Sequence, residues 1–158
     1  MAIDEAGLRA WRSMLLAYNA AMRAIDAEFD RAGNIPLTWY DVLLELNAAP
    51  DRRLRMRELA DRVVLSRTRV SRLVDEMSRT DLVTKTQDDA DRRSVWASIT
   101  DAGVQELRRT APRYMCSIEA FFTTHLTEEE KKTVSEALER VHAAHVNGHP
   151  NKIGRPQR

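Results

Sequence analysis

The segment of residues 56–77 constrains the fold most strongly, because it contains two short apolar helical stripes on either side of a turn. The apolar residues of the first stripe recur at the i, i+3, i+4, i+7 spacing of a helix with one buried face: Met56, Leu59, Ala60 and Val63. Val64 and Leu65 form the predicted turn, and the Ser66 hydroxyl suits the N-cap of a second helix. The pattern predicts a helix-turn-helix.

The second predicted helix separates its apolar and polar side chains onto two faces. The side chains expected on its inner face are Val70, Leu73, Val74 and Met77. A rotation of about 100° per residue directs Thr68, Arg72 and Asp75 outward. The side chains beside this outer face are Arg67, Arg69 and Ser71. Such a face can offer guanidinium donors to guanine edges and hydroxyls to bases or phosphates, and the positive end of the helix dipole favours phosphate.

Positive charge is concentrated around this motif. Residues 52–72 contain eight arginines and two acidic residues, whereas the whole chain has a formal net charge of only +1. A local surplus of this kind is typical of a protein that binds a phosphate backbone, although an arginine-rich solvated helix face would give the same count. The charge therefore needs support from a second feature.

That second feature is a predicted hairpin directly after the helix-turn-helix. Its strands are expected at 82–86 and 95–99, where β-branched residues and an imperfect alternation occur, and a polar tip joins them. Arg92 and Arg93 at the tip can enter a narrow minor groove, where the negative potential is enhanced. We expect Asp91 to pair with one of these arginines and to hold the tip in shape. Helix-turn-helix and hairpin together predict DNA binding.

Both ends of the chain carry apolar residues at the alternating three- and four-residue spacing of a long helix with an apolar partner. Near the N-terminus they are Leu8, Trp11, Leu15, Tyr18, Met22, Ile25 and Phe29. After residue 100 they are Val104, Leu107, Ala111, Tyr114, Ile118, Phe121 and His125. Gly33 and Pro36 are expected to end the first helix, and a capping box at 127–130 to begin the last. The spacing fits an intramolecular bundle as well as an interface between two chains.

Composition narrows the class of protein. The chain has 158 residues, 43% of them hydrophobic and 31% charged, which suits one globular domain with a substantial core. No apolar run approaches membrane-spanning length and the first residues lack a signal-peptide core, so we expect a cytoplasmic protein. An enzyme is disfavoured, because the sequence contains no Gly-x-Ser-x-Gly, no His-Glu-x-x-His and no phosphate-binding glycine loop.

Two residue types bear on a regulatory signal. Cys116 is the only cysteine, and we interpret it as a buried, unreactive thiol, with a redox switch as the alternative. The histidines with a spacing that metal ligands can have are His125, His142, His145 and His149. His145 falls on an apolar stripe and His149 follows Gly148, where the helix is expected to end, so no metal or cofactor is assigned.

Six short motifs along the chain share the order and spacing of a known family. They are LTWYDVL at 37–43, LADR at 59–62 with LSR at 65–67, RLVD at 72–75, DRR at 91–93 and ITDAG at 99–103. This set resembles the MarR family of winged-helix transcription regulators, over nearly the whole chain. Asp81 stands where that family typically has glycine, so we expect it to adopt the left-handed conformation that ends a helix.

The resemblance implies a fold class and a domain organisation. The fold is expected to be mainly α with a small two- or three-stranded antiparallel wing, that is, a winged helix-turn-helix plus long dimerisation helices. The expected regions within one integrated domain are an N-terminal dimerisation helix at 1–36, the DNA-binding region at 37–100, C-terminal dimerisation helices at 101–147 and a flexible basic tail at 148–158.

The resemblance also implies partners. It indicates a homodimer that binds a palindromic operator in double-stranded DNA, with half-sites about one helical turn apart. A small-molecule effector is expected to release this dimer from the operator. The aromatic residues on segments that flank the effector cleft of the family are Trp11, Tyr18, Trp39 and Tyr40. A metal- or thiol-responsive regulator of the same fold and a nonspecific architectural DNA-binding protein remain as alternatives.

Overall fold

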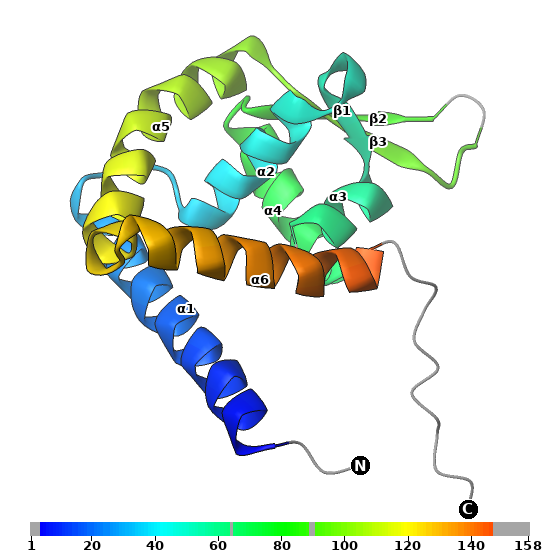
Figure 1. The fold of residues 1–158 in the computed structure, drawn as a ribbon. Helices are drawn as coiled ribbons and strands as arrows, with labels where there is room; N and C mark the ends of the chain where they lie inside the picture. Colours follow the sequence, from blue (N-terminus) through cyan, green and yellow to red (C-terminus); the bar gives the residue numbers. More distant parts are fainter. Residues whose placement is uncertain (1–3, 64, 89–90, 147–158) are drawn as a thin grey trace, which may run out of the picture. The chain divides into compact units, whose positions relative to one another are not determined.

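The computed structural model describes residues 4–63, 65–88 and 91–146 (Figure 1). The chain divides into two compact units, residues 1–118 and residues 119–158. The first unit holds the predicted helix-turn-helix and hairpin. The expected turn residue Val64 and the expected tail at 148–158 lie outside the described residues.

Helix α1 (Glu5–Arg31) begins at Asp4, whose carboxylate accepts the backbone N–H of Gly7, and gives way to Gly33 at a φ of +65°. Only its C-terminal half reaches the core of this chain, through the buried Ile25 and Phe29. The apolar residues of its N-terminal half are exposed, Trp11 by 56% and Tyr18 by 63%. The helix therefore carries an apolar stripe that this single chain covers only in part.

Helix α2 (Leu37–Ala48) forms the centre of the first unit, because apolar residues occupy most of its positions. Its buried residues are Leu37, Tyr40, Val42, Leu43 and Leu46. The rings of Phe29 and Tyr40 both pack against Tyr114, with centroids at 6.1 and 4.8 Å, so α1 and α2 meet helix α5 (Asp101–Phe121) in an aromatic cluster. This cluster joins the first helix to the rest of the unit.

The predicted helix-turn-helix is confirmed as α3 (Met56–Arg62) and α4 (Arg67–Arg79). Ser66 caps α4, since its hydroxyl oxygen accepts the backbone N–H of Arg69 at 3.3 Å. Val70, Val74 and Met77 are buried and Leu73 is half-buried, as the periodicity predicts. After α4 the chain turns at Asp81, whose φ of +59° is the expected left-handed conformation.

The hairpin consists of β2 (Val83–Gln87) and β3 (Val95–Ile99), and a third strand, β1 (Arg53–Arg55), pairs with the other side of β3. The sheet is antiparallel in the order β1-β3-β2. Leu54, Ala97 and Lys85 lie side by side in one row, and Arg55, Trp96 and Thr86 in the next, on the opposite face. The three-stranded form of the expected wing is confirmed, and β1 completes it.

The connection from the sheet to α5 requires a glycine. The Thr100 hydroxyl oxygen accepts the backbone N–H of Gly103 at 2.9 Å and caps α5. A Cβ atom on Gly103 would lie 2.3 Å from the carbonyl oxygen of Leu82, which is far inside van der Waals contact. The Ile-Thr-x-x-Gly motif thus brings the first turn of α5 against the start of β2.

The second unit contains the short helix η2 (Thr123–His125) and helix α6 (Glu128–Val146). The predicted capping box begins α6, where the Glu130 carboxylate accepts the backbone N–H of Thr127 at 2.9 Å. His125 was expected on the helical seam of α5, and this is wrong, because α5 ends at Phe121 and His125 belongs to η2. In the described part of the chain no helix is long and apolar enough to span a membrane.

Candidate nucleic-acid interface

The polar face of α4 lies open to solvent. Arg67, Thr68, Arg69 and Arg72 are exposed, and Ser71 is half-buried. On the wing, Arg92 and Arg93 are exposed as well. The side chains that sequence reasoning selected are therefore accessible on two neighbouring elements. Their capacity to donate hydrogen bonds is not consumed by the ion pairs found among the described residues.

A groove of about 780 Å³ separates the helix-turn-helix from the wing. Its charged and hydroxyl lining is contributed by Arg55, Arg57, Glu58, Asp61, Arg67, Ser71, Lys85, Asp91, Arg93 and Ser94. Three predicted residues, Arg67, Ser71 and Arg93, therefore share one concave surface, while Thr68, Arg69, Arg72 and Arg92 are not among its lining residues. Five cations against three acidic residues give this surface a positive balance.

Sequence reasoning missed three of these cations. Arg55 and Arg57 belong to the arginine-rich segment, but their roles depend on β1 and on the start of α3, which the hairpin pattern did not include. Lys85 lies on β2, where its Nζ is 2.6 Å from Oδ1 of Asp75 on α4. Asp75 was expected to point outward, and its side chain is 45% exposed there and pairs with this lysine. The pair ties the wing to α4.

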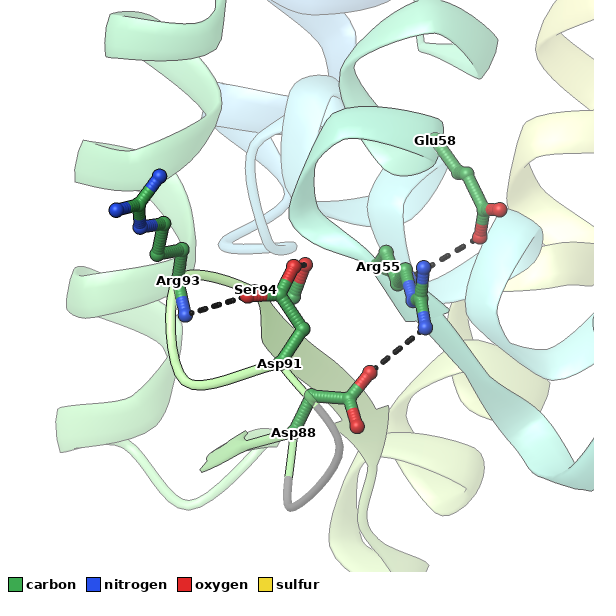
Figure 2. A network of polar contacts seen from close by, with 6 residues as sticks. All are labelled: Arg55, Glu58, Asp88, Asp91, Arg93 and Ser94. Atoms are coloured by element: carbon green, nitrogen blue, oxygen red, sulfur yellow. Dashed lines mark hydrogen bonds and ion pairs between the residues drawn. The ribbon is translucent and has the colours of Figure 1, made fainter.

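The tip of the wing is shaped by Asp91. Its Oδ1 accepts the backbone N–H of Arg93 at 3.0 Å, and its Oδ2 accepts the hydroxyl of Ser94 at 3.0 Å (Figure 2). The expected ion pair with Arg92 or Arg93 is absent from the described residues. The carboxylate is occupied by groups within its own turn, and the Arg93 side chain extends away from it (Figure 2). Among the described residues, this carboxylate therefore holds the backbone of Arg93 and not its guanidinium.

The base of the wing is held by Arg55. Its Nη2 lies 2.7 Å from Oδ2 of Asp88, whose side chain is only 11% exposed. Its backbone N–H donates to the Glu58 carboxylate at 3.2 Å, which fixes Arg55 at the N-cap of α3. The guanidinium also lies 5.1 Å from the ring centroid of Trp96, and that of Arg53 lies 4.8 Å from it. These contacts join three strands at the neck of the hairpin.

The four aromatic residues proposed for an effector cleft have different surroundings. Trp11 and Tyr18 are exposed on α1, Trp39 is half-buried and Tyr40 is buried against Tyr114. Burial is the main cause that raises the pKa of Tyr114, with smaller contributions from Asp41, Tyr40 and Tyr18, which places these groups in one neighbourhood. None of the four aromatic residues lines the groove described above.

An acidic residue on α2 adds to this neighbourhood. Burial, together with the smaller effect of the negative charges of Asp26 and Glu45, raises the pKa of Asp41 to about 6. Sequence reasoning noted Asp41 only as part of a motif. Its environment depends on the packing of α1 and α2, which a single sequence pattern does not reveal.

The structure also gives the surroundings of the cysteine and of the histidines that were considered as signal-sensing residues. Cys116 was interpreted as buried, and this is wrong, because it is exposed on α5. It follows the buried Leu107 by nine residues, which is about half a turn away from the buried face of the helix. The Nδ1 of His145 lies 2.8 Å from the carbonyl oxygen of Val141, and His149 lies outside the described residues. The described residues contain no group of three or more potential metal ligands.

Comparisons with known proteins agree with this architecture. Residues 34–94 match the model of the MarR family. An uncharacterized HTH-type transcriptional regulator of Bacillus cereus is 25% identical over 128 residues, which cover 81% of this chain and 84% of that protein.

Two solved structures from Streptomyces coelicolor are similar along most of the chain. The MarR family transcriptional regulator AbsC has a TM-score of 0.78 and 25% identity, over 94% of this chain and 99% of that one. The MarR family transcriptional regulator Sco3205, solved in complex with DNA, has a TM-score of 0.79 and 29% identity, over 91% of this chain and 90% of that one.

Proposed function

We propose that this chain, a winged helix-turn-helix protein of the MarR family, is a homodimeric repressor that binds a palindromic operator and is released by a small molecule. The observation that carries the DNA-binding part is the groove between α3, α4 and the wing, which brings Arg67, Ser71 and Arg93 onto one positive surface. The structure of Sco3205 in complex with DNA supports the same use of this fold. A regulator of this kind acts in the cytoplasm and needs no enzymatic centre.

In this proposal α4 enters the major groove. Arg69 and Arg72 can each make two hydrogen bonds to a guanine edge, while Thr68 and Ser71 donate to bases or phosphates. Arg67 at the first position of α4 lies where the helix dipole favours a phosphate. These roles follow from exposure and from the position of each residue on the helix.

The wing makes the second contact. Arg92 and Arg93 extend from a tip that Asp91 holds in shape, and a guanidinium at this position suits the minor groove beside the site of α4. A phosphodiester strand between the two grooves then faces the cations that line the groove of the protein. Such contacts provide affinity and register, whereas α4 provides most of the sequence preference.

The dimer is supported by apolar side chains that this chain leaves uncovered. On α1 these exposed residues are Leu8, Trp11, Leu15, Leu16 and Tyr18. On α6, within the second unit, they are Leu138 and Val141. Monomeric soluble proteins rarely expose apolar stripes of this length, so a second copy of the chain is the expected partner. A twofold dimer then presents two α4 helices to successive major grooves of a palindrome.

Effector release is proposed through thermodynamic linkage. A small molecule bound near Trp11, Tyr18, Trp39 and Tyr40 would prefer a dimer whose α4 helices are misplaced for DNA, and DNA would weaken the binding of that molecule by the same factor. The aromatic neighbourhood of Tyr40 and Tyr114 supports an aromatic ligand at the junction of α1, α2 and α5.

A thiol-responsive regulator is a second candidate, because Cys116 is exposed rather than buried. It is distinguished by operator binding with and without an oxidant, in the protein as it stands and in the Cys116→Ser variant. Oxidant-dependent release that the substitution abolishes would favour this candidate over a ligand-responsive regulator.

The proposed function is tested by selection of bound oligonucleotides from a random pool, followed by footprinting and by sedimentation of the free protein. We expect a palindromic consensus, protection of two half-sites about one helical turn apart, and a dimer. Binding of every pool sequence with similar affinity would instead identify a nonspecific architectural protein. Repetition with candidate aromatic compounds then reveals the effector through the loss of protection.

A further inference from the structure

A series of polar contacts runs from the start of α3 to the tip of the wing, and Figure 2 shows the side-chain contacts around Arg55 and around Asp91 that form its two ends. It begins at Arg55, whose backbone N–H is held by the Glu58 carboxylate and whose guanidinium is paired with Asp88 at 2.7 Å. The backbone N–H of Asp88 donates to the carbonyl oxygen of Ser94 at 3.0 Å, which closes the neck of the hairpin. The series thus reaches from the body of the helix-turn-helix to the tip.

The last contacts of the series fix Arg93. The Ser94 hydroxyl donates to Oδ2 of Asp91 and the Arg93 backbone N–H donates to Oδ1 of the same carboxylate, both at 3.0 Å. The Ser94 backbone N–H also donates to the Asp91 carbonyl oxygen at 2.8 Å. The backbone from which the Arg93 side chain departs is therefore anchored to the neck.

The hydrogen-bonded pairing of the strands ends before the tip of the wing. The register of β1 with β3 ends at Arg55 and Trp96, and that of β2 with β3 ends at Gln87 and Val95. Arg55 crosses the central strand over the Trp96 ring and meets Asp88 one residue beyond the end of β2. The ion pair therefore ties the neck to β1 at the point where the hairpin leaves the sheet.

Burial makes this pair different from an ordinary surface ion pair. The Asp88 side chain is 11% exposed, so water solvates its carboxylate poorly and the ion pair with Arg55 compensates its charge, whereas the Arg55 side chain is 45% exposed. Removal of the cation would take a charged partner from this poorly hydrated carboxylate and would release the neck from β1. The angle of the wing is then no longer defined.

We propose that Arg55 is a positioning residue, which acts through its ion pair with Asp88 to hold Arg93 at the spacing from α4 that the DNA requires. The inference rests on the proposed function, because it assigns to Arg93 a contact with the duplex. It adds a positioning role to Arg55, which also lines the groove, and a role for Asp88, which is not among the lining residues.

The direction in which one substitution changes the affinity for DNA distinguishes a positioning role from an effect of charge alone. Asp88→Asn removes a negative charge near the binding surface, so long-range electrostatics alone would tighten DNA binding. If Asp88 instead positions the wing, the same substitution weakens binding to the duplex recovered by selection, by about fivefold or more. Tighter or unchanged binding by the Asp88→Asn variant would overturn the proposal.

A matched pair of variants separates the role of Arg55 from its charge. Arg53 lies on the same strand, contacts the same Trp96 ring and carries the same charge, but its ion pair is with the exposed Asp51 at 3.7 Å. Arg55→Ala is expected to weaken binding several-fold more than Arg53→Ala. Equal losses would reduce both residues to contributors of positive charge and would contradict the proposal.

A double-mutant cycle tests the connection to the tip. Arg93→Ala should weaken binding in the wild-type chain but have little further effect in the Asp88→Asn background, because the arginine is already misplaced there. Arg72→Ala on α4 is the control, and its effect should be the same in both backgrounds. Additive losses for Arg93 and Asp88 would show that the pair does not position the tip.

Hydrogen exchange in the absence of DNA keeps the test independent of the proposed function. In Arg55→Ala and Asp88→Asn, peptides that cover residues 86–96 should exchange faster, while peptides of α4 are unchanged and Arg53→Ala resembles the wild type. Unaltered exchange at the wing overturns the proposal, whatever the DNA measurements give. Faster exchange in a protein that binds no duplex supports the anchoring of the wing and rejects the proposed function instead.

Discussion

The Nζ of Lys85 on β2 lies 2.6 Å from the Oδ1 of Asp75 on α4, so the wing and the helix proposed to enter the major groove are joined directly. Both side chains are about one-third to one-half exposed, 32% for Lys85 and 45% for Asp75. Such a pair contributes little to stability, about 0–1 kcal/mol, because water already solvates both charges. Its consequence is electrostatic, since the carboxylate neutralises a cation that lines the groove.

Substitution of Asp75 by asparagine should therefore change DNA binding more than folding. We expect the Asp75→Asn variant to unfold within about 1 kcal/mol of the wild type and to bind random-sequence duplex more tightly, because Lys85 is released toward the phosphates. Urea denaturation and fluorescence anisotropy measure the two effects. Weaker nonspecific binding would mean that the ion pair matters chiefly for geometry.

Arg72 should carry sequence preference. If its guanidinium makes a bidentate contact with a guanine edge, the Arg72→Ala variant loses about 1–3 kcal/mol on the preferred site and less on others. A repeated oligonucleotide selection with this variant should give a consensus degenerate at one position in each half-site. A consensus identical to that of the wild type would exclude Arg72 from base readout.

We expect Arg93 to contribute about equally to the binding of every DNA sequence. The Arg93→Ala variant removes one cation from the wing tip, so its binding should weaken on every duplex and its dependence on salt should become shallower by about one counterion. Titrations at several salt concentrations measure the slope, with Arg31→Ala on α1 as a control of equal charge far along the chain from the wing. An unaltered slope would show that the wing arginine does not reach the duplex.

Sequence periodicity predicted the helix-turn-helix well, because the burial of Leu59, Ala60, Val70 and Val74 depends on spacing within each helix alone. The cap at Ser66 and the left-handed Asp81 were also predictable from local chemistry. These features need only a few consecutive residues, which the sequence displays directly.

Contacts between segments that are distant in the sequence could not be predicted from periodicity or local chemistry. The three residues of β1 are too short and too basic to show a strand pattern, so the contact of Arg55 with Asp88, 33 positions later, could not be anticipated. The pairing of Asp75 with Lys85 and the exposure of Cys116 depend likewise on how elements pack. Tertiary packing decides these positions, and periodicity only limits the choices.

We expect the exposed apolar residues of α1 to form the dimer interface. Leu15 is 39% exposed within this chain and lies on the predicted seam, so the Leu15→Glu variant should dissociate a dimer that buries this stripe. Ser13→Glu adds the same charge on the opposite side of the helix and should leave the dimer intact. Sedimentation velocity distinguishes monomer from dimer.

Loss of the dimer should also weaken operator binding by far more than twofold, because the second half-site would no longer be bound intramolecularly. If Leu15→Glu and Ser13→Glu sediment alike as dimers, α1 does not form the interface in this way.

Asp41 predicts a dependence of stability on pH. Folding raises its pKa from the ordinary 3.8 to about 6, through burial and the neighbouring charges of Asp26 and Glu45, so the folded chain binds this proton more tightly than the unfolded chain. The contribution of Asp41 is therefore most favourable below the unfolded pKa and is lost as the pH rises through about 6. Because the group is partly accessible to solvent, we expect a loss on the order of 1 kcal/mol rather than the full shift.

The Asp41→Asn variant tests this dependence, because its side chain stays neutral at every pH. Urea denaturation at about pH 5 and about pH 7.5 should show the wild type less stable at the higher value, while the Asp41→Asn variant loses less over the same interval and is the more stable protein at neutral pH. Asp61→Asn on the exposed side of α3 is the control and should follow the wild type. A wild-type chain that gains stability from Asp41 between these two pH values would mean that the carboxylate finds a favourable partner when it ionises, and that burial does not dominate its environment.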